Sequence, residues 1–178
     1  MCIRGSNYAT ASFGQGIWMT SIQLIRAYSA LANGGVLVRP SVAKIKQEET
    51  PPARQVIDPE TSKTIAKMLA SVVDNGFGKS AKIKGYSIAG KTGTAEKIVD
   101  GRYSKTENVS SFVGMFPADK PEIGIIVVLD NPHPLRTGGV TAGPVFAEIA
   151  APSARYMDIP SMDAEDWVYY EPTQAEAP

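Results

Sequence analysis

The chain has 178 residues, which is enough for one domain with a hydrophobic core. Lys plus Arg and Asp plus Glu number 18 each, and this zero net charge argues against a nucleic-acid partner, because phosphate binding usually shows as a basic excess. The sequence has a single histidine, His133, which excludes a histidine-based zinc cluster, and a single cysteine, Cys2, which excludes an internal disulfide. We expect neither metal nor cofactor.

The first predicted element is a helix. We interpret residues 1–12 as an irregular or engineered start. Apolar residues then recur at helical spacing from Thr20 or Ser21 to about Asn33, where two glycines end the pattern. Residues 36–45 alternate as extended chain and predict two short strands broken by a proline.

A second helix is predicted to begin at Asp58, whose side chain can cap it, with Pro59 in its first turn. We expect it to end at Asn75 in a left-handed cap formed by Gly76. Its predicted buried stripe consists of Ile65, Met68, Leu69 and Val72. Residues 76–85 are interpreted as a flexible basic loop.

The second half predicts one antiparallel sheet in sequence order. Its strands are residues 86–97, 109–116 and 122–130, of which the last is apolar enough for the sheet interior. Residues 98–108 are interpreted as a polar loop and 117–121 as a tight turn. The first strand is expected at the accessible edge.

A helix follows the sheet. We interpret residues 136–143 as a glycine-rich loop and expect Pro144 to open a helix that Pro152 interrupts. Residues 157–178 predict an acidic, proline-bearing tail or linker. The fold class is therefore α+β, an antiparallel sheet covered by helices.

Residues 85–92, GYSIAGKT, match the phosphate-binding pattern of P-loop NTPases, and Asp130 ends an apolar strand as a magnesium ligand does. However, a phosphate loop leads directly into a helix, whereas Gly93 and Thr94 follow here. The strands before Asp130 are joined by a turn too short for a parallel crossover. A P-loop NTPase is therefore kept only as a remote alternative.

The same residues favour an acyl-transfer site. Lys91 supplies a fixed positive charge for a substrate carboxylate, and the hydroxyls of Thr92 and Thr94 can hydrogen-bond it. Gly93 lets an extended substrate lie against the strand edge. The backbone amide of Thr94 can form one half of an oxyanion hole.

Four segments in order strengthen this interpretation: SFGQGIWMTSIQLIRAYSALANGG, AGKTGTAEK, SSFVGMFPADKPEIGIIVVLDNP and GGVTAGPVFAEIA. With them the chain resembles the C-terminal part of the transpeptidase domain of class B penicillin-binding proteins. The resemblance implies a partial penicilloyl-serine transferase (β-lactamase/transpeptidase-like) fold. It also implies a D,D-transpeptidase that cross-links peptidoglycan stem peptides and is the target of β-lactams.

The resemblance implies further that Lys91, Thr92, Gly93 and Thr94 form the third active-site motif. The resemblance implies that the enzyme acts on the extracytoplasmic face of the bacterial membrane. Its implied partners there are cell-wall synthesis proteins that serve cell division or cell shape. The resemblance also implies an N-terminal membrane segment as the anchor, absent from this chain. No stretch of this chain approaches the ~18 apolar residues that span a bilayer.

The family's two earlier motifs, S-x-x-K with the nucleophile and S-x-N, are not matched in their expected places. The sequence has no S-x-N, and its one S-x-x-K, Ser41 to Lys44, follows Pro40 in a strand-like stretch that points the two side chains to opposite faces. We therefore interpret residues 13–156 as the C-terminal part of the domain and expect an upstream part to carry the nucleophile. A binding or scaffold fragment without chemistry of its own is the alternative.

Overall fold

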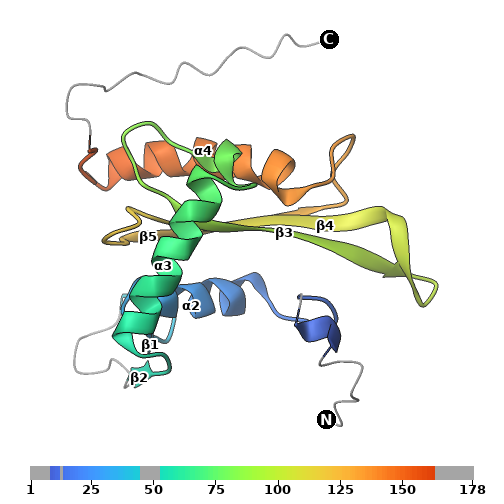
Figure 1. Cartoon of the computed structure of the whole chain (residues 1–178), viewed down its shortest axis with the longest axis horizontal. Coiled ribbons are helices and arrows are strands. Elements are labelled where there is room, and N and C mark those ends of the chain that lie inside the picture. The colour runs from blue at the N-terminus through green and yellow to red at the C-terminus, as the bar shows by residue number, and fades with distance from the viewer. Residues whose placement is uncertain (1–8, 13, 45–52, 163–178) are drawn as a thin grey trace.

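The sheet lies between helices on its two faces (Figure 1). The computed structural model describes residues 9–12, 14–44 and 53–162. On one face lies helix α4 (Gly138–Tyr156), and on the other lies α2 (Ser21–Ala32). Helix α3 (Pro59–Asp74) crosses one end of the sheet. The short strands β1 (Val36–Leu37) and β2 (Arg54–Gln55) pair beside α2.

The three main strands form an antiparallel sheet in the order β3 (Ala89–Val99), β4 (Arg102–Phe116) and β5 (Ile123–Asp130). This confirms the predicted topology, with the K-T-G-T residues on an outer strand. The expectation that the last strand suits the interior is wrong, because β4 is central and Val128 of β5 remains 46% exposed.

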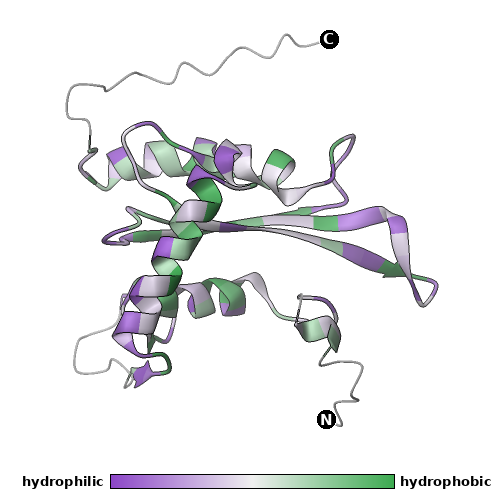
Figure 2. Ribbon diagram, in the orientation of Figure 1, coloured by the Kyte–Doolittle hydropathy of each residue, from purple (hydrophilic) through white to green (hydrophobic). Residues whose placement is uncertain are grey.

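Two hydrophobic clusters hold the layers together. Between the sheet and α4, the rings of Phe112 and Phe116 both pack edge-on against Phe146. On the other face, Leu69 of α3 packs with Ala89 and Met115. Figure 2 shows that hydrophilic residues become frequent where β3 and β4 extend beyond the helices.

The first two of the three predicted helix starts are confirmed. Thr20 and Gln23 form a reciprocal capping box at α2, and the Asp58 side chain accepts a 2.8 Å bond from Thr61 N at α3. The left-handed cap at Gly76 is wrong, since its φ is not positive. Gly76 is instead close to the preceding turn: an added Cβ would lie 2.8 Å from Val72 O.

Other details of the second helix also differ from the prediction. Met68 is 63% exposed, and the buried positions are Ser62, Leu69 and Val73. The predicted flexible loop after α3 contains a short 3-10 helix, η2 (Lys79–Ala81), whose Ala81 is fully buried.

The predicted polar loop at 98–108 is wrong, because β3 and β4 continue through it and form a long hairpin. Asp100 and Gly101 form its two-residue turn with φ of 50° and 74°. Asp-Gly is a strong signal for this turn, which requires positive φ at both residues. The polar composition arises because this ribbon extends past the helices into solvent, as Figure 1 shows.

The predicted loop at 136–143 is also wrong, because α4 begins at Gly138 and contains Pro144 and Pro152 inside a continuous helix. Gly138, Gly139 and Gly143 are buried against neighbouring backbone and side chains, and that packing outweighs the poor helix propensity of glycine.

Strand structure is not seen at residues 41–44, which form a bend in which the Ser41 hydroxyl bonds to the backbone of Ala43. Beyond α4, Ile159 is 1% exposed, and its carbonyl accepts a 2.9 Å bond from the Tyr86 hydroxyl. The start of the predicted tail is therefore attached to the fold at Ile159, although Met157 and Met162 on either side remain 53% and 70% exposed. Residues 163–178 and most of the predicted start, 1–8, lie outside the described residues.

Candidate active site

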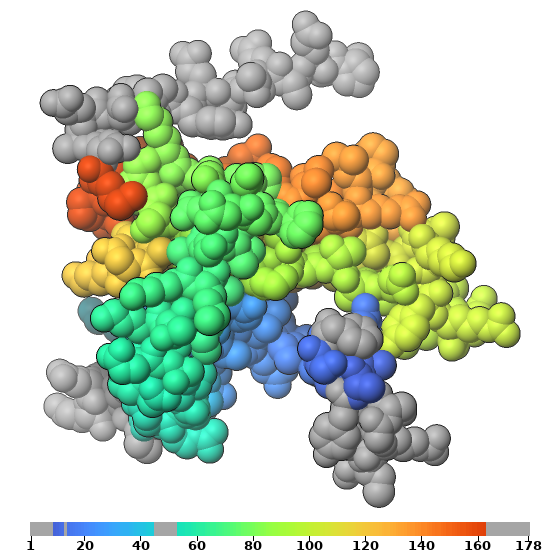
Figure 3. Space-filling model, in the orientation of Figure 1, coloured from blue at the N-terminus to red at the C-terminus, as the bar shows by residue number. Residues whose placement is uncertain are grey.

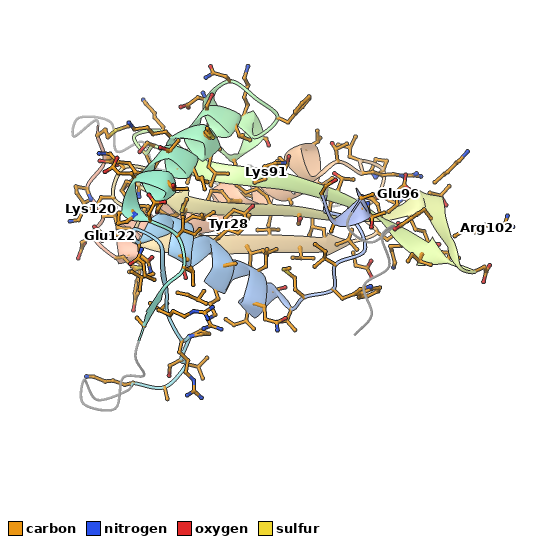
Figure 4. All side chains as sticks on the ribbon, turned by 60° about the horizontal axis from the view of Figure 1, so that its bottom comes forward. Tyr28, Lys91, Glu96, Arg102, Lys120 and Glu122 are labelled. Atoms are coloured by element: carbon orange, nitrogen blue, oxygen red, sulfur yellow. The ribbon has the colours of Figure 1, made fainter. Side chains whose placement is uncertain are left out.

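The K-T-G-T residues begin where helix α3 leaves the edge of the sheet. Ala89 and Gly90, which open β3, are buried, whereas Lys91 and Thr94 are exposed. Within the described residues, β4 is the only strand paired with β3. Figure 4 shows Lys91 and Glu96 along this strand and Arg102 at the far end of the hairpin. The edge from Lys91 onward is therefore open to an extended ligand.

Alternation places the four residues on two faces. Ala89 packs with α2 and α3, so Lys91 and Gly93 share that face. The Cβ position of Gly90 lies against the ring of Phe112, which packs on α4, so Thr92 and Thr94 face α4. The cation and the two hydroxyls thus flank one strand edge from opposite sides.

The peptide groups of Thr92 and Thr94 are turned to the open edge. A Cβ added at Gly138 would lie 2.3 Å from Gly93 O and 3.1 Å from Ser111 N, so this carbonyl is directed at β4. Because peptide directions alternate along a strand, the N–H and C=O groups of Thr92 and Thr94 point the other way. The Lys91 ammonium donates a 2.8 Å bond to Thr92 O, in agreement with this orientation.

Gly93 lies opposite Ser111 in the register, and the absence of its side chain makes room for a hydroxyl. A Cβ added at Gly93 would lie 2.4 Å from Ser111 Oγ but 3.8 Å from Ser111 Cβ. A small side chain here therefore displaces the Ser111 hydroxyl first.

The first residue of α4 holds the Thr94 side chain. Gly138 N donates a 3.1 Å bond to Thr94 Oγ1. A hydroxyl that accepts from a backbone N–H keeps its own proton for donation. The arrangement therefore leaves the Thr94 hydroxyl able to act as a hydrogen-bond donor to a ligand.

A buried polar network positions the start of α4. Ser110 is fully buried, and its hydroxyl donates to Arg136 O, two residues before the helix. Asn108 is 5% exposed, and its Nδ2 donates to the same carbonyl at 2.6 Å and to Ser110 Oγ at 2.9 Å. These contacts connect the central strand to α4 and, through Gly138, to Thr94.

Sequence interpretation missed this supporting layer. The two glycines at 138–139 were assigned to a loop, and Asn108 and Ser110 were not singled out. The signal was the pair of adjacent glycines itself, which indicates close backbone approach as well as turn formation, and in the structure the pair begins α4.

Farther along β3, Lys97 forms an ion pair with Asp130 at 2.9 Å and lies 3.9 Å from Glu107. The hydrogen bond to Asp130 raises the pKa of Lys97, and the charges of Asp130 and Glu107 add to this effect. The pair joins the outer strands β3 and β5 across β4.

No group of three His, Cys, Asp or Glu side chains in the described part of the chain could hold a metal ion. None of the described helices combines the length and apolar character needed to span a membrane. The Asp130 that suggested a magnesium ligand is instead paired with Lys97.

Comparison with known proteins identifies the family and the solved structures that share this architecture. The family model described as the penicillin binding protein transpeptidase domain matches residues 4–151. Stage V sporulation protein D of Bacillus subtilis is 41% identical over 152 residues, covering 79% of this chain and 24% of that protein. The probable peptidoglycan D,D-transpeptidase PenA of Neisseria flavescens is 37% identical over 153 residues, which cover 85% of this chain and 38% of that protein.

Solved structures give the same result. The transpeptidase domain of Burkholderia pseudomallei penicillin-binding protein 3, in its apo form, superposes with a TM-score of 0.81 at 35% identity and covers 89% of this chain and 49% of that one. Penicillin-binding protein 3 of Mycobacterium tuberculosis, complexed with ampicillin, superposes with a TM-score of 0.79 at 33% identity. This match covers 89% of this chain and 39% of that one.

The fold class is therefore the α+β penicilloyl-serine transferase class, as predicted. The chain belongs to the penicillin-binding protein transpeptidase domain family. It spans about a quarter to two fifths of the length of the two curated relatives named above.

Proposed function

We propose that this chain is the substrate-binding part of a peptidoglycan D,D-transpeptidase that works by serine acyl transfer. The observation that carries the proposal is the open edge of β3, where the peptide groups of Thr92 and Thr94 point outward beside the Lys91 ammonium. Membership of the family, with relatives that are named D,D-transpeptidases, supports it.

Each motif residue has a role in this proposal. The D-Ala-D-Ala end of a stem peptide adds to the edge of β3 as an extra strand. Lys91 attracts its carboxylate, and the Thr94 hydroxyl, with its proton free to donate, bonds to that carboxylate together with Thr92. The Thr94 amide stabilises the oxyanion that forms when a serine oxygen attacks the carbonyl. Gly93 keeps the strand surface flat.

The nucleophilic serine and its base come from an upstream part of the same domain. Serine attack breaks the peptide C–N bond, and the departing D-alanine amine takes a proton. The amine of a second stem peptide then displaces the serine from the acyl-enzyme, which restores the hydroxyl. β-Lactams undergo only the first step, the attack by the serine. In this proposal the enzyme works among cell-wall synthesis proteins on the extracytoplasmic face of the membrane.

Covalent labelling by a fluorescent penicillin tests the proposal. We compare this chain alone with the complete domain, meaning the chain joined to the part that carries the nucleophile. The complete domain is expected to label stoichiometrically, and the chain alone is expected not to label. Labelling of the lone chain that Ser41→Ala abolishes would show that Ser41 is the nucleophile.

A complete domain that does not label at all would favour the scaffold alternative. Lys91→Ala in the complete domain serves as the internal comparison, since slower labelling by that variant ties the reaction to this strand.

A further inference from the structure

Phe77 is an exposed aromatic residue beside the candidate active site. Its side chain is 89% exposed, although the loop that carries it is firmly held. The backbone N–H groups of Gly76 and Gly78, on either side of Phe77, both donate 3.1 Å bonds to Val72 O in the last turns of α3. The phenyl ring is thus presented from a fixed backbone.

The same loop is attached to α4. The Ser80 hydroxyl donates to Gly139 O, and Ala81 is fully buried in the core. A Cβ added at Gly139 would lie 2.4 Å from Phe77 O. The Phe77 carbonyl therefore faces α4, and the ring extends into solvent.

Gly139 also connects Phe77 to the K-T-G-T strand. The Cβ position of Gly139 that lies 2.4 Å from Phe77 O lies 3.4 Å from Thr92 Cγ2. Thr92 and Thr94 face α4, so Phe77 stands at the border of the surface that carries the two hydroxyls. Figure 3 shows the end of α3 and the following loop, in green, standing over β3, in yellow-green.

This position defines what the ring can contact. Helix α3 covers the β3 edge at Ala89 and Gly90, so a ligand on the open edge ends next to the loop that follows α3. An exposed phenyl ring gains free energy when apolar surface covers it. The neighbouring Thr92 is a proposed carboxylate contact, so the group nearest the ring is the one attached next to the carboxylate.

We propose that Phe77 forms an apolar wall beside the open edge of β3 at Thr92 and selects ligands by the group they carry next to their carboxylate. The inference rests on the proposed function, since Thr92 is placed at the carboxylate by that proposal. Phe77 thereby acts as a specificity-determining residue, and it takes no part in proton transfer or in the oxyanion hole.

Two cephalosporins that share one acyl side chain test this role in the complete domain. One carries hydrogen at ring position 3, next to the carbon that bears the carboxylate, and the other carries a large aromatic group there. The second-order acylation rate is measured for wild type, Phe77→Ala and Phe77→Leu.

Phe77→Ala is expected to lower the rate with the aromatic compound about tenfold and to change the rate with the unsubstituted one less than about twofold, the range typical of one apolar pocket contact. Phe77→Leu should fall between. Tyr156→Ala is the matched control, because Tyr156 is an aromatic residue with 91% exposure at the opposite end of α4. It should leave both rates unchanged.

Equal rate changes for both compounds would overturn the inference and leave the proposed function standing. A lowered unfolding temperature for Phe77→Ala without compound dependence would also overturn it, because it would mean that another segment covers the ring. If the wild-type complete domain reacts with neither compound, the proposed function itself fails, and the inference fails with it.

Discussion

The closest approach in the candidate active site lies between Gly138, at the start of α4, and the backbone of two strands. A methyl group at Gly138 would lie 2.3 Å from Gly93 O and 2.4 Å from Ser111 O. Neither oxygen can rotate away, because both belong to strand backbone. Even the shortest tolerated contact, about 3.0 Å, requires α4 or the strands to move by at least ~0.7 Å.

This displacement acts on Thr94 directly. The bond from Gly138 N to Thr94 Oγ1 is 3.1 Å long, and a shift of this size takes it past the hydrogen-bonding range. Overpacking costs about 1–3 kcal/mol of stability, from which the better helix propensity of alanine recovers at most about 1 kcal/mol. Displacing a substrate-positioning group by about 1 Å costs on the order of a hundredfold in rate.

We therefore expect Gly138→Ala to lower the acylation rate of the complete domain by about 10- to 100-fold and to lower its unfolding temperature. The assays are stopped-flow acylation by a fluorescent penicillin and thermal unfolding. Gly124→Ala is the matched control, because its methyl would meet only the flexible end of Ile25 at 3.3 Å. Acylation of the folded Gly138→Ala protein at the wild-type rate would refute the positioning role.

Three further predictions concern the same strand. Gly93→Val should slow acylation several hundred-fold through the loss of one oxyanion donor, worth about 3–4 kcal/mol, and adding Ser111→Ala should recover stability but not rate. Lys91→Ala should slow acylation less for a substrate without a carboxylate than for one that carries it. Because the pKa of Lys97 is raised in the folded state, its ion pair with Asp130 contributes stability that is fully present below the unfolded pKa of about 10.4. That stability is lost as the pH rises through the folded pKa. Lys97→Met should therefore remove this alkaline dependence of the unfolding temperature.

Each of these predictions has an outcome against it. Near-normal acylation by Gly93→Val contradicts the oxyanion role, as does recovery of rate by Ser111→Ala. Equal penalties for Lys91→Ala on both substrates contradict carboxylate recognition. An unchanged alkaline unfolding profile in Lys97→Met means that the ion pair with Asp130 contributes nothing to stability.

The sheet could be predicted from the sequence because its last strand is a short apolar run and the turn before that strand is short and proline-bearing. The hairpin at 98–108 was missed because a solvated ribbon has the composition of a loop, although Asp100 and Gly101 carried the turn signal. The first part of α4 was missed because glycine and proline count as helix breakers when only local propensity is considered. Tertiary packing of Gly138 and Gly139 reverses that preference.

The motif residues of the candidate site could also be predicted, since their chemistry resides in their side chains or in a glycine that lacks one. Their supporting residues act through backbone contacts. Ser110 and Asn108 bond to a carbonyl 26 and 28 residues away in sequence. A pairing of this kind depends on where the chain returns, and no local pattern encodes it.

An edge open to a peptide is also open to another copy of the same strand, which makes β3 an aggregation hazard. Several features limit it. Helix α3 covers Ala89 and Gly90, and a bulge between Glu96 and Ile98 breaks the regular register that a second β3 would need. Charged side chains at Lys91 and Glu96 disfavour an in-register parallel pairing of two identical edges, because each then meets a like charge. The segment that remains regular and uncovered therefore runs only from Lys91 to Glu96, which limits the length of edge that a second copy could pair with.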